Sequence, residues 1–440
     1  MPAQHRTPLT YRDLLTLWQD WMDEAPDFPL LDQWLRKRAR HQGKQPTAMR
    51  QELDNALMQA MHYRQLADVL EVTFKDPDFS NWHTWDTIWS HTNSPEAMPQ
   101  HFWYWIQLRS GADWQTPLQL PQRKDRRQHF LKFRTFIQQH PETTEQYLWY
   151  GFRPNWLTWL QRRQQASLWT PDQQDHFLKS QPHRPPLWLR STGAEQPTLE
   201  ALEHSLQNEG VQVEREETAL KATGGTDIYQ THAFKHGQVE IQDRASQMII
   251  EAIQPKPGDK IWDACAGAGG KSLAMAARMN QKGSITATDI KANKLNELKR
   301  RAKRAGYRNI RTFEWQGDAP LRLPAEIKKH GGFDKVLIDA PCSSSGTWRR
   351  NPDARWRLSL RRQSLHQLQQ QLLQHAADAV RPGGYLIYAT CSWLVDENEE
   401  QVNTFLKAHP DFQLHTQQLT GLPEYNSDTM FVAVLLRNPD

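Results

Sequence analysis

The N-terminal part of the chain carries apolar side chains at the spacing of amphipathic helices. Leucine and tryptophan recur every three or four positions within 11–22, and leucine and methionine do so within 49–67. This periodicity predicts a helix over each of these ranges. Prolines interrupt the pattern repeatedly, which divides the segment into separate helices. We therefore expect residues 1–180 to form a helical domain.

The pattern changes after 181–186, a proline-rich segment that we interpret as a linker. A short apolar run at 187–190 predicts a strand, 199–208 has the periodicity of a helix, and 211–213 resembles a second strand. Residues 181–240 are therefore expected to form a small α+β subdomain.

From residue 242 onward, short apolar runs alternate with helical stretches. The candidate strands cover 260–264, 284–288, 309–313, 335–338 and 385–388, and the helices between them cover 271–278, 293–305 and 360–380. Such alternation predicts a doubly wound, largely parallel sheet that binds ligands at the carboxyl ends of its strands. The fold class expected for residues 241–440 is therefore α/β and Rossmann-like.

Composition narrows the class of protein. The chain has 440 residues, enough for two or three domains. The polar start over 1–12 argues against secretion, and no run approaches the ~18 apolar residues of a membrane span. Three cysteines without paired spacing argue against a disulfide framework and against a zinc site. We therefore expect a cytoplasmic protein without a bound metal.

Basic residues are informative only where they cluster, because the net charge of +4 is small. One cluster lies within 36–44 and includes Arg36 and Arg38, and a second lies within 123–134. Either cluster can be a solvated helix face or a surface that contacts RNA phosphates, since few acidic residues interrupt them.

Tryptophan gathers in the same region, where 14 of the 19 precede residue 190. Trp82, Trp85 and Trp89 are spaced to share one face of a helix. Large aromatic side chains usually anchor cores, so we expect these residues to pack internally rather than to stack on bases.

A glycine-rich segment, 266–272, follows the first strand of the Rossmann-like region. A strand, a glycine-rich turn and a helix bring the backbone close to a nucleotide-type ligand. Asp289 ends the next strand, 26 residues after Asp263, where a carboxylate can accept hydrogen bonds from both ribose hydroxyls. Asp318 and Asp339 follow later strands in the same way, which makes four aspartates at successive strand ends.

Three ligands compete for this loop. A Walker A loop requires glycine where this chain has Cys265, and a dinucleotide loop prefers a glycine spacing that this chain lacks. S-adenosylmethionine fits best, because it has no phosphates for the loop to cradle.

Two of the three cysteines follow apolar strands of the same domain. Cys342 lies in Asp-Ala-Pro-Cys after 336–338, and Cys391 lies in Ala-Thr-Cys-Ser after 385–388. Both thiols are expected at the carboxyl edge of the sheet, above the cofactor. A thiolate that adds to carbon 6 of a cytosine makes carbon 5 able to attack a methyl sulfonium. Two cysteines and the carboxylate of Asp339 supply the groups for this reaction, although the residues alone do not rank one thiol above the other.

At these motifs the chain resembles the Sun-type, or RsmB-like, RNA 5-methylcytosine methyltransferases. The resemblance covers roughly 184–437, and its most specific parts are 339–353 and 388–392. It implies an S-adenosylmethionine-dependent enzyme that acts on RNA, with ribosomal RNA as the first expected substrate and transfer RNA as the second. It also implies a NusB-like fold for the helical domain, RNA binding by both N-terminal parts, and a monomer.

The resemblance assigns a role to individual residues. Cys391 is the expected nucleophile, Cys342 assists elimination, Asp339 holds the base edge, and Lys271 orders the site. Arg349 and Arg350 are expected to position the RNA backbone or the motif loop. The residues expected to line the methyl donor are Cys265, Ala266, Gly267, Ala268, Gly269, Gly270, Lys271, Asp289, Asp318 and Asp339.

The chain departs from the family pattern at two places. Gly267 and Ala268 replace the usual Ala-Pro of the loop, and 428–431 replaces the usual Asp-Gly-Phe-Phe. The altered loop leaves open an RNA-binding or ribosome-assembly factor with an idle methyltransferase fold. DNA cytosine methylation is disfavoured, since it needs no second Thr-Cys motif. Amino-group methylation is disfavoured because the Pro-Pro-aromatic motif is absent after Asp339.

Overall fold

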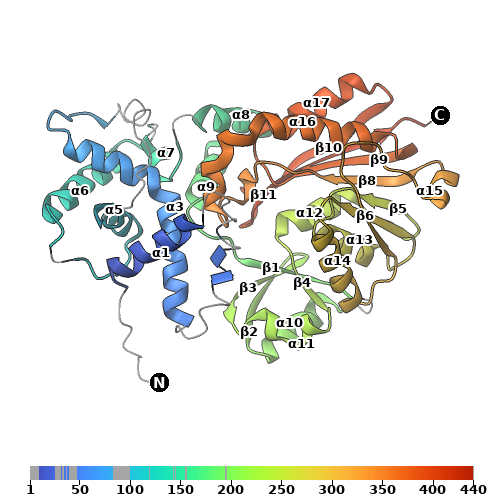
Figure 1. Ribbon diagram of the computed structural model, residues 1–440, viewed down its shortest axis with the longest axis horizontal. Helices are drawn as coiled ribbons and strands as arrows, with labels where there is room; N and C mark the ends of the chain where they lie inside the picture. Colours follow the sequence, from blue (N-terminus) through green and yellow to red (C-terminus); the bar gives the residue numbers. More distant parts are fainter. Residues whose placement is uncertain are drawn as a thin grey trace. The chain divides into compact units, whose positions relative to one another are not determined.

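The computed structural model describes residues 9–24, 31, 34, 35, 37, 38, 47–82, 100–117, 119–141, 143, 145–153, 156–193 and 196–439 (Figure 1). The chain forms two compact units. The first contains 1–161, 175–184 and 348–356, and the second contains 162–174, 185–347 and 357–440. None of the described helices is long and apolar enough to cross a membrane.

The described part of the first unit is all helical. The predicted helices over 11–22 and 49–67 are confirmed as α1 (Tyr11–Asp23) and α3 (Thr47–Lys75), and the latter is longer than predicted. Further helices are α5 (Gln100–Ser110), α6 (Arg123–Gln139), α7 (Glu145–Trp149), α8 (Leu157–Ser167) and α9 (Pro171–Ser180), the last two lying across the division between the units. This helical region fits the expected NusB-like domain.

Tryptophans anchor the core of this first unit. Trp18 lies edge-on to Trp21 and Trp103, with ring centroids 5.5 and 6.2 Å away. Trp82 packs against Phe133 at 4.6 Å, so core packing is confirmed for these residues. Trp85 and Trp89, from the same predicted series, lie outside the described residues, as does Arg36.

The second unit begins with a small antiparallel sheet. Its strands are β1 (Leu187–Ser191), β2 (Val211–Glu216), β3 (Ala219–Gly225) and β4 (Val239–Ile241), in the order β2-β3-β1-β4. The helices α10 (Leu199–Asn208) and α11 (His232–Lys235) belong to the same segment. The predicted α+β pattern is confirmed, although β3 and β4 were not expected.

The main sheet of the second unit has seven strands in the order β10-β11-β9-β8-β5-β6-β7. Five of them are parallel: β5 (Lys260–Asp263), β6 (Ser284–Asp289), β7 (Ile310–Glu314), β8 (Phe333–Asp339) and β9 (Val380–Thr390). These five strands confirm the predicted alternation. The chain leaves β5 toward β6 and β7 and later returns to the other side of β5 with β8, so the order reverses between β5 and β8.

Helices cover both faces of this sheet (Figure 1). Side chains of α12 (Arg244–Ile253), α13 (Gly270–Arg278) and α14 (Ala292–Arg304) share one core with Ile261 and Leu337. Side chains of α15 (Ala325–Lys329), α16 (Leu358–Ala377) and α17 (Glu399–Ala408) share the other core with Trp262 and Val336. Neighbouring residues of a strand therefore serve opposite cores, as a doubly wound sheet requires.

Two antiparallel strands, β10 (Phe412–Gly421) and β11 (Thr429–Arg437), complete the sheet and were not predicted. β11 pairs with both β9 and β10, and its first seven residues are buried. Both strands were missed because no helix lies between them to mark them as part of the alternation of strands and helices.

Candidate active site

The carboxyl ends of adjacent parallel strands gather the predicted polar residues at one edge of the sheet. Asp263 ends β5, Asp289 ends β6, and Asp339 ends β8. Cys391 follows directly after β9, which pairs with β8. This edge includes the point where the strand order reverses, which is where open α/β sheets bind their ligands.

The glycine-rich loop between β5 and α13 depends on two left-handed glycines. Gly267 has φ +55°, and its backbone N–H donates to Asp289 Oδ2 at 2.9 Å. Gly269 has φ +86°, and a Cβ atom there would lie 2.4 Å from Cγ of Leu298 in α14. The loop therefore packs closely on α14 and is tied to the end of β6. Gly267, one of the two departures from the family loop, needs no side chain to make this contact.

A buried ion-pair group supports the same loop from behind. Arg301 Nη1 donates to the carbonyl of Ala268 at 2.7 Å, and Arg301 Nη2 donates to Glu240 Oε2 at 2.7 Å. The other carboxylate oxygen of Glu240 accepts a hydrogen bond from Arg304. Glu240 belongs to β4 and is 3% exposed. The small subdomain thus holds the cofactor-type loop through one arginine.

Asp263 is a buried carboxylate beneath the loop. Its Oδ2 accepts a hydrogen bond from Ser272 Oγ at 2.5 Å, and its Oδ1 has no hydrogen-bond partner among the described residues. Burial raises the pKa of Asp263 to about 7, against the lowering effect of the Ser272 hydrogen bond. A buried acceptor without a donor is costly unless a ligand completes it.

Lys271 and Asp339 form an ion pair across the strand ends. The Nζ of Lys271 donates to Asp339 Oδ2 at 2.7 Å, and the lysine is only 8% exposed. Burial alone would lower the pKa of Lys271, but the carboxylate of Asp339 outweighs it and raises that pKa. The lysine therefore remains a cation at the edge where both thiols emerge.

The structure brings Cys342 and Cys391 into contact. Their Sγ atoms are 3.3 Å apart, and Cys391 Sγ also lies 3.4 Å from Ser344 Oγ. The hydrogen bond from Cys342 is the main cause that lowers the pKa of Cys391, with further lowering by Ser344 and Lys271. The same hydrogen bond, together with burial, raises the pKa of Cys342. Cys391 is therefore the better thiolate of the pair, and Cys342 the thiol that donates to it.

Two contacts fix the loop that carries Cys342. Glu397 is fully buried, and its carboxylate accepts hydrogen bonds from the backbone N–H and the hydroxyl of Ser343 at 2.8 and 2.5 Å. The N–H of Gly346 donates to the carbonyl of Cys391 at 3.0 Å. A Cβ atom on Gly346 would lie 1.6 Å from the carbonyl oxygen of Thr429, so only glycine fits there.

Cys265 and Asp318 are the remaining residues that the sequence analysis expected to line the methyl donor. Burial and the nearby aspartates raise the pKa of Cys265 well above its ordinary value, which leaves this third thiol protonated. Asp318 is exposed in the turn after β7. The loop residues from Ala266 to Gly270 lie at the strand ends, as the sequence predicts.

The arginines expected to contact RNA all belong to the first unit where they are described. Arg349 is 2% exposed, and its Nε donates to the carbonyls of Ser180 and His183 at 3.0 and 2.8 Å. It has little surface to offer an RNA, so it is not among the RNA contacts proposed below. Arg350 is partly exposed, and Arg38 lies 3.9 Å from Asp20.

Comparison with known proteins agrees with this geometry. Residues 250–436, which contain the strand ends and both thiols, match the model of the family described as 16S rRNA methyltransferase RsmB/F. The domain that these residues form belongs to the RsmB/F family.

Curated relatives match this chain over part of their length. "Probable ribosomal RNA small subunit methyltransferase B" of Bacillus subtilis (strain 168) is 36% identical over 220 residues, 49% of this chain and 48% of the relative. "Ribosomal RNA small subunit methyltransferase B" of Klebsiella pneumoniae (strain ATCC 700721) is 33% identical over 299 residues, 64% of this chain and 66% of the relative. The chain thus matches between about half and two thirds of the length of these relatives.

Solved structures share the fold at lower identity. PH0851 is 24% identical with a TM-score of 0.68, and the match covers 98% of this chain and 100% of that one. NSun6 from Pyrococcus horikoshii with SFG is 16% identical with a TM-score of 0.52, covering 64% of this chain and 98% of that one. These two likenesses concern the fold alone.

The sequence analysis did not identify several polar residues that support this site. They contact Asp263, Cys391, Ser343 and the glycine-rich loop, and they are Ser272, Ser344, Glu397 and Arg301. Glu397 lies in an acidic run after the Cys391 motif. Such a run usually indicates exposed residues, yet the Glu397 carboxylate is fully buried. Arg301 had no signal, because its partner Glu240 lies 61 residues away.

Proposed function

We propose that this chain is an S-adenosylmethionine-dependent RNA (cytosine-5)-methyltransferase that acts on ribosomal RNA. The observation that carries the proposal is the pair of thiols of Cys342 and Cys391, 3.3 Å apart beside the Lys271–Asp339 ion pair. A single nucleophile needs only one thiol, and two thiols in contact at a cofactor edge serve addition and elimination on the same ring. The descriptions of the family and of the two relatives support a ribosomal substrate.

The residues at the strand ends fit S-adenosylmethionine. Asp289 retains acceptor capacity for ribose hydroxyls, since each carboxylate oxygen offers two lone pairs and accepts only one backbone N–H among the described residues. The unpartnered Oδ1 of Asp263 suits the ammonium group of the amino-acid half. S-adenosylmethionine has no phosphate groups, so its site needs no cluster of phosphate-binding side chains. When bound, the cofactor supplies an electrophilic methyl group on a sulfonium.

Cys391 begins the reaction by adding to the ring. Its lowered pKa increases the fraction of the thiolate, which is the nucleophilic form. The sulfur forms a bond to carbon 6 of the cytosine, and the ring electrons move so that carbon 5 becomes nucleophilic and takes the methyl group. Asp339, held by Lys271, binds the edge of the base, where its carboxylate accepts a hydrogen bond from the exocyclic amino group. The target base has to leave its stack to reach these groups, which favours single-stranded or loop RNA.

Cys342 assists the second half of the reaction. The proton on carbon 5 passes to solvent water, its electron pair restores the ring double bond, and the bond from carbon 6 to the Cys391 sulfur breaks, which releases Cys391 as a thiolate. A hydrogen bond from the Cys342 thiol stabilises the departing thiolate, in the same way as it stabilises that thiolate in the free protein. Both thiols must be reduced, which fits a cytoplasmic enzyme. Every group in this scheme lies in one chain, so a monomer suffices.

A trapped covalent complex tests the proposal. Cys342→Ala protein purified from cells should show a slow-migrating band on a denaturing gel that collapses with ribonuclease, because elimination is impaired while addition is not. Cys391→Ser should show neither this band nor methylation. Cys265→Ala is the matched control, since this third thiol has no role in the scheme, and it should form no trapped complex.

Sequencing of the trapped RNA would name the target and separate ribosomal from transfer RNA. A Cys342→Ala protein that folds and binds S-adenosylmethionine, but traps no RNA and whose wild-type form transfers no methyl group, would instead support the idle-scaffold alternative.

A further inference from the structure

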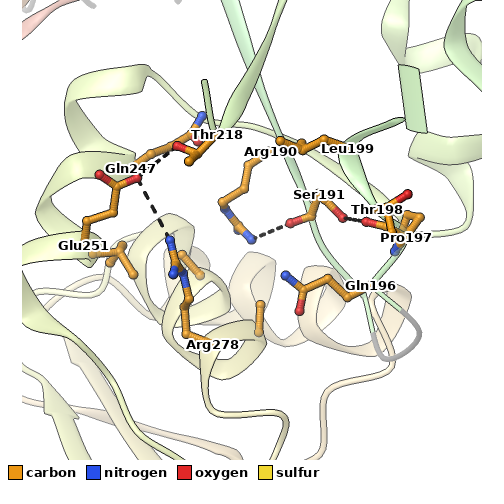
Figure 2. A pocket seen from close by; sticks show the side chains of 13 residues that line it. Arg190, Ser191, Gln196, Pro197, Thr198, Leu199, Thr218, Gln247, Glu251 and Arg278 are labelled. Carbon is orange, nitrogen blue, oxygen red and sulfur yellow. Dashed lines mark hydrogen bonds and ion pairs between the residues drawn. The ribbon is translucent and has the colours of Figure 1, made fainter. Parts of the chain in front are cut away.

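A cavity of about 350 Å³ lies away from the catalytic thiols, within the second unit (Figure 2). One wall comes from the small subdomain, through β1, the start of α10 and the turn between β2 and β3. The other wall comes from α12 and α13 of the Rossmann-like domain. The polar residues that line it are Arg190, Ser191, Gln196, Thr198, Thr218, Gln247, Glu251 and Arg278.

Arg190 points into this cavity (Figure 2). Its Nε donates to Gln242 Oε1 at 2.7 Å, and its Nη1 donates to the carbonyl of Ser191 at 3.1 Å. Its Nη2 is buried and has no hydrogen-bond partner among the described residues. No carboxylate of the described residues forms an ion pair with the guanidinium of Arg190. Burial lowers the pKa of Arg190 to about 10, so the group is still a cation at neutral pH. A buried cation without a partner is costly, and an anionic ligand would remove this cost.

Arg278 adds a second positive charge at the edge of the cavity. It lies 4.0 Å from Glu251, and its side chain is 54% exposed. The carboxylate of Glu251 is already paired with Arg244 at 2.8 Å, from outside the lining. Arg244 also pairs with Glu217 at 3.7 Å, so it does not serve Glu251 alone. The described lining itself holds two arginines and one carboxylate, and it therefore keeps an excess of positive charge.

The N-terminus of α10 adds backbone donors to the same space. Thr198 caps this ten-residue helix by accepting from the N–H of Ala201 at 3.1 Å, and both Thr198 and Leu199 line the cavity. The first N–H groups of a helix and the positive end of its dipole favour anions. Here the helix end lines the same cavity as Arg190, whose Nη2 has no hydrogen-bond partner among the described residues.

We propose that this cavity binds a backbone phosphate of the substrate RNA, outside the target nucleotide. The inference rests on the proposed function and names a contact of the same substrate. A guanidinium with a free N–H is suited to phosphate oxygens. Thr198, Thr218 and Arg278 leave the mouth exposed, so a strand can continue past the bound phosphate. Arg278 ends the helix that begins at Gly270, about 12 Å away along its axis, a distance that a few nucleotides span.

Binding of RNA to charge-removing variants tests the proposal. The probe is a fluorescein-labelled single-stranded RNA containing one cytosine, followed by anisotropy from about 50 to 200 mM salt. Arg190→Gln should weaken binding about tenfold or more, and Arg278→Gln severalfold, because each removes a charged donor to phosphate. Each should reduce the slope of log affinity against log salt by about 0.7. The affinity for S-adenosylmethionine, measured by calorimetry, should not change.

Arg300→Gln is the matched control, since Arg300 is 73% exposed on α14 and pairs only with Glu297 among the described residues. It should leave affinity and slope within experimental error. The double variant Arg190→Gln/Arg278→Gln should lose less than the product of the single losses, because both arginines would serve one phosphate. Should Arg190→Gln fail to fold, the exposed Arg278→Gln still tests the cavity.

Unchanged RNA affinity and slope in both single variants would overturn the proposal. So would inorganic phosphate that raises the melting temperature of the wild type while both variants bind RNA normally, because the cavity would then hold a free anion. Wild-type protein that binds RNA through these arginines but transfers no methyl group would overturn the proposed function and leave the phosphate site standing.

Discussion

The Sγ atoms of Cys342 and Cys391 lie 3.3 Å apart, although 49 residues separate the two cysteines in the chain. This distance is a thiol–thiolate hydrogen bond rather than a disulfide, which would require about 2.05 Å. The contact arises because β8 and β9 are parallel neighbours, so the residues that follow them share one edge of the sheet. It divides the pair into a stronger acid, Cys391, and a weaker one, Cys342.

This division predicts how the two thiols react with a small alkylating agent. At neutral pH, iodoacetamide should modify Cys391 before Cys342, because only thiolate is nucleophilic. Replacing Cys342 with alanine removes the main cause that lowers the pKa of Cys391. The pH midpoint for alkylation of Cys391 should therefore rise. Mass spectrometry of the two peptides against pH measures this directly.

Lys271→Met should move the same midpoint in the same direction but less, since the lysine is a smaller cause. Cys265→Ala serves as the control and should leave the profile of Cys391 unchanged. Faster alkylation of Cys342 than of Cys391 in the wild type would contradict the assignment of the nucleophile.

Because the pKa of Asp263 is raised, we expect the stability of the cofactor-free protein to depend on pH. Its pKa is raised by burial to about 7 in the folded protein, whereas an unfolded aspartate titrates near 3.9. The folded state therefore holds the proton more tightly than the unfolded state. The contribution of this group to stability is complete below about pH 4 and is lost as the pH rises through about 7.

Asp263→Asn should remove this loss. The free energy of unfolding of the variant should be similar to that of the wild type near pH 4 and higher near pH 8, by on the order of a few kcal/mol. Asp411→Asn, at a carboxylate that is 48% exposed, is the control and should show no such crossover. A constant difference between Asp263→Asn and wild type across this pH range would show that Asp263 does not titrate as described.

We expect that position 346 does not tolerate the single methyl group that alanine would add. In Gly346→Ala the new Cβ would lie 1.6 Å from the backbone carbonyl of Thr429, and backbone cannot move away cheaply. We expect a loss of about 2–4 kcal/mol in the free energy of unfolding and loss of the Cys342–Cys391 contact. Urea unfolding measures the first effect, and the alkylation profile measures the second.

Gly270→Ala is the stability control, because a Cβ at this helical position meets nothing within 4 Å. It should keep or slightly raise the free energy of unfolding. An equal loss in both variants would mean that the loop around Gly346 has room to adjust.

How far the sequence predicted this molecule depends on the range of the interactions involved. Strands β5 to β9 could be predicted because apolar runs are local, and the order of the chain then placed Cys342 and Cys391 at one edge. The strands β10 and β11 were missed because antiparallel pairing over 412–437 leaves no helix between them to mark their ends.

The contacts between side chains could not be predicted in the same way. Nothing local distinguishes Arg349, which is buried against two carbonyls, from an arginine on an RNA surface. Glu397 likewise occurs in an acidic run that usually indicates an exposed helix start, yet it is fully buried against Ser343. Such roles are decided by which distant elements meet, and this becomes visible only in the folded chain.

Because Arg301 connects the glycine-rich loop to the small subdomain, we expect cofactor binding to depend on that subdomain. Its two Nη atoms join the carbonyl of Ala268 in the cofactor-type loop to Glu240 in β4. Arg301→Gln cannot span both partners and leaves Glu240 with one cation, Arg304. The loop should lose its support, and the dissociation constant for S-adenosylmethionine should rise about tenfold, as calorimetry would measure.

The neighbouring Arg300→Gln is again the control, since it removes an exposed arginine of the same helix without touching the loop. Glu240→Gln should weaken S-adenosylmethionine in the same direction as Arg301→Gln, because the arginine then loses the carboxylate that orients it. A double variant no weaker than either single one would show that both residues act through this one connection. Normal cofactor affinity in Arg301→Gln would mean that the glycine-rich loop holds its shape through Gly267, Gly269 and Asp289 alone.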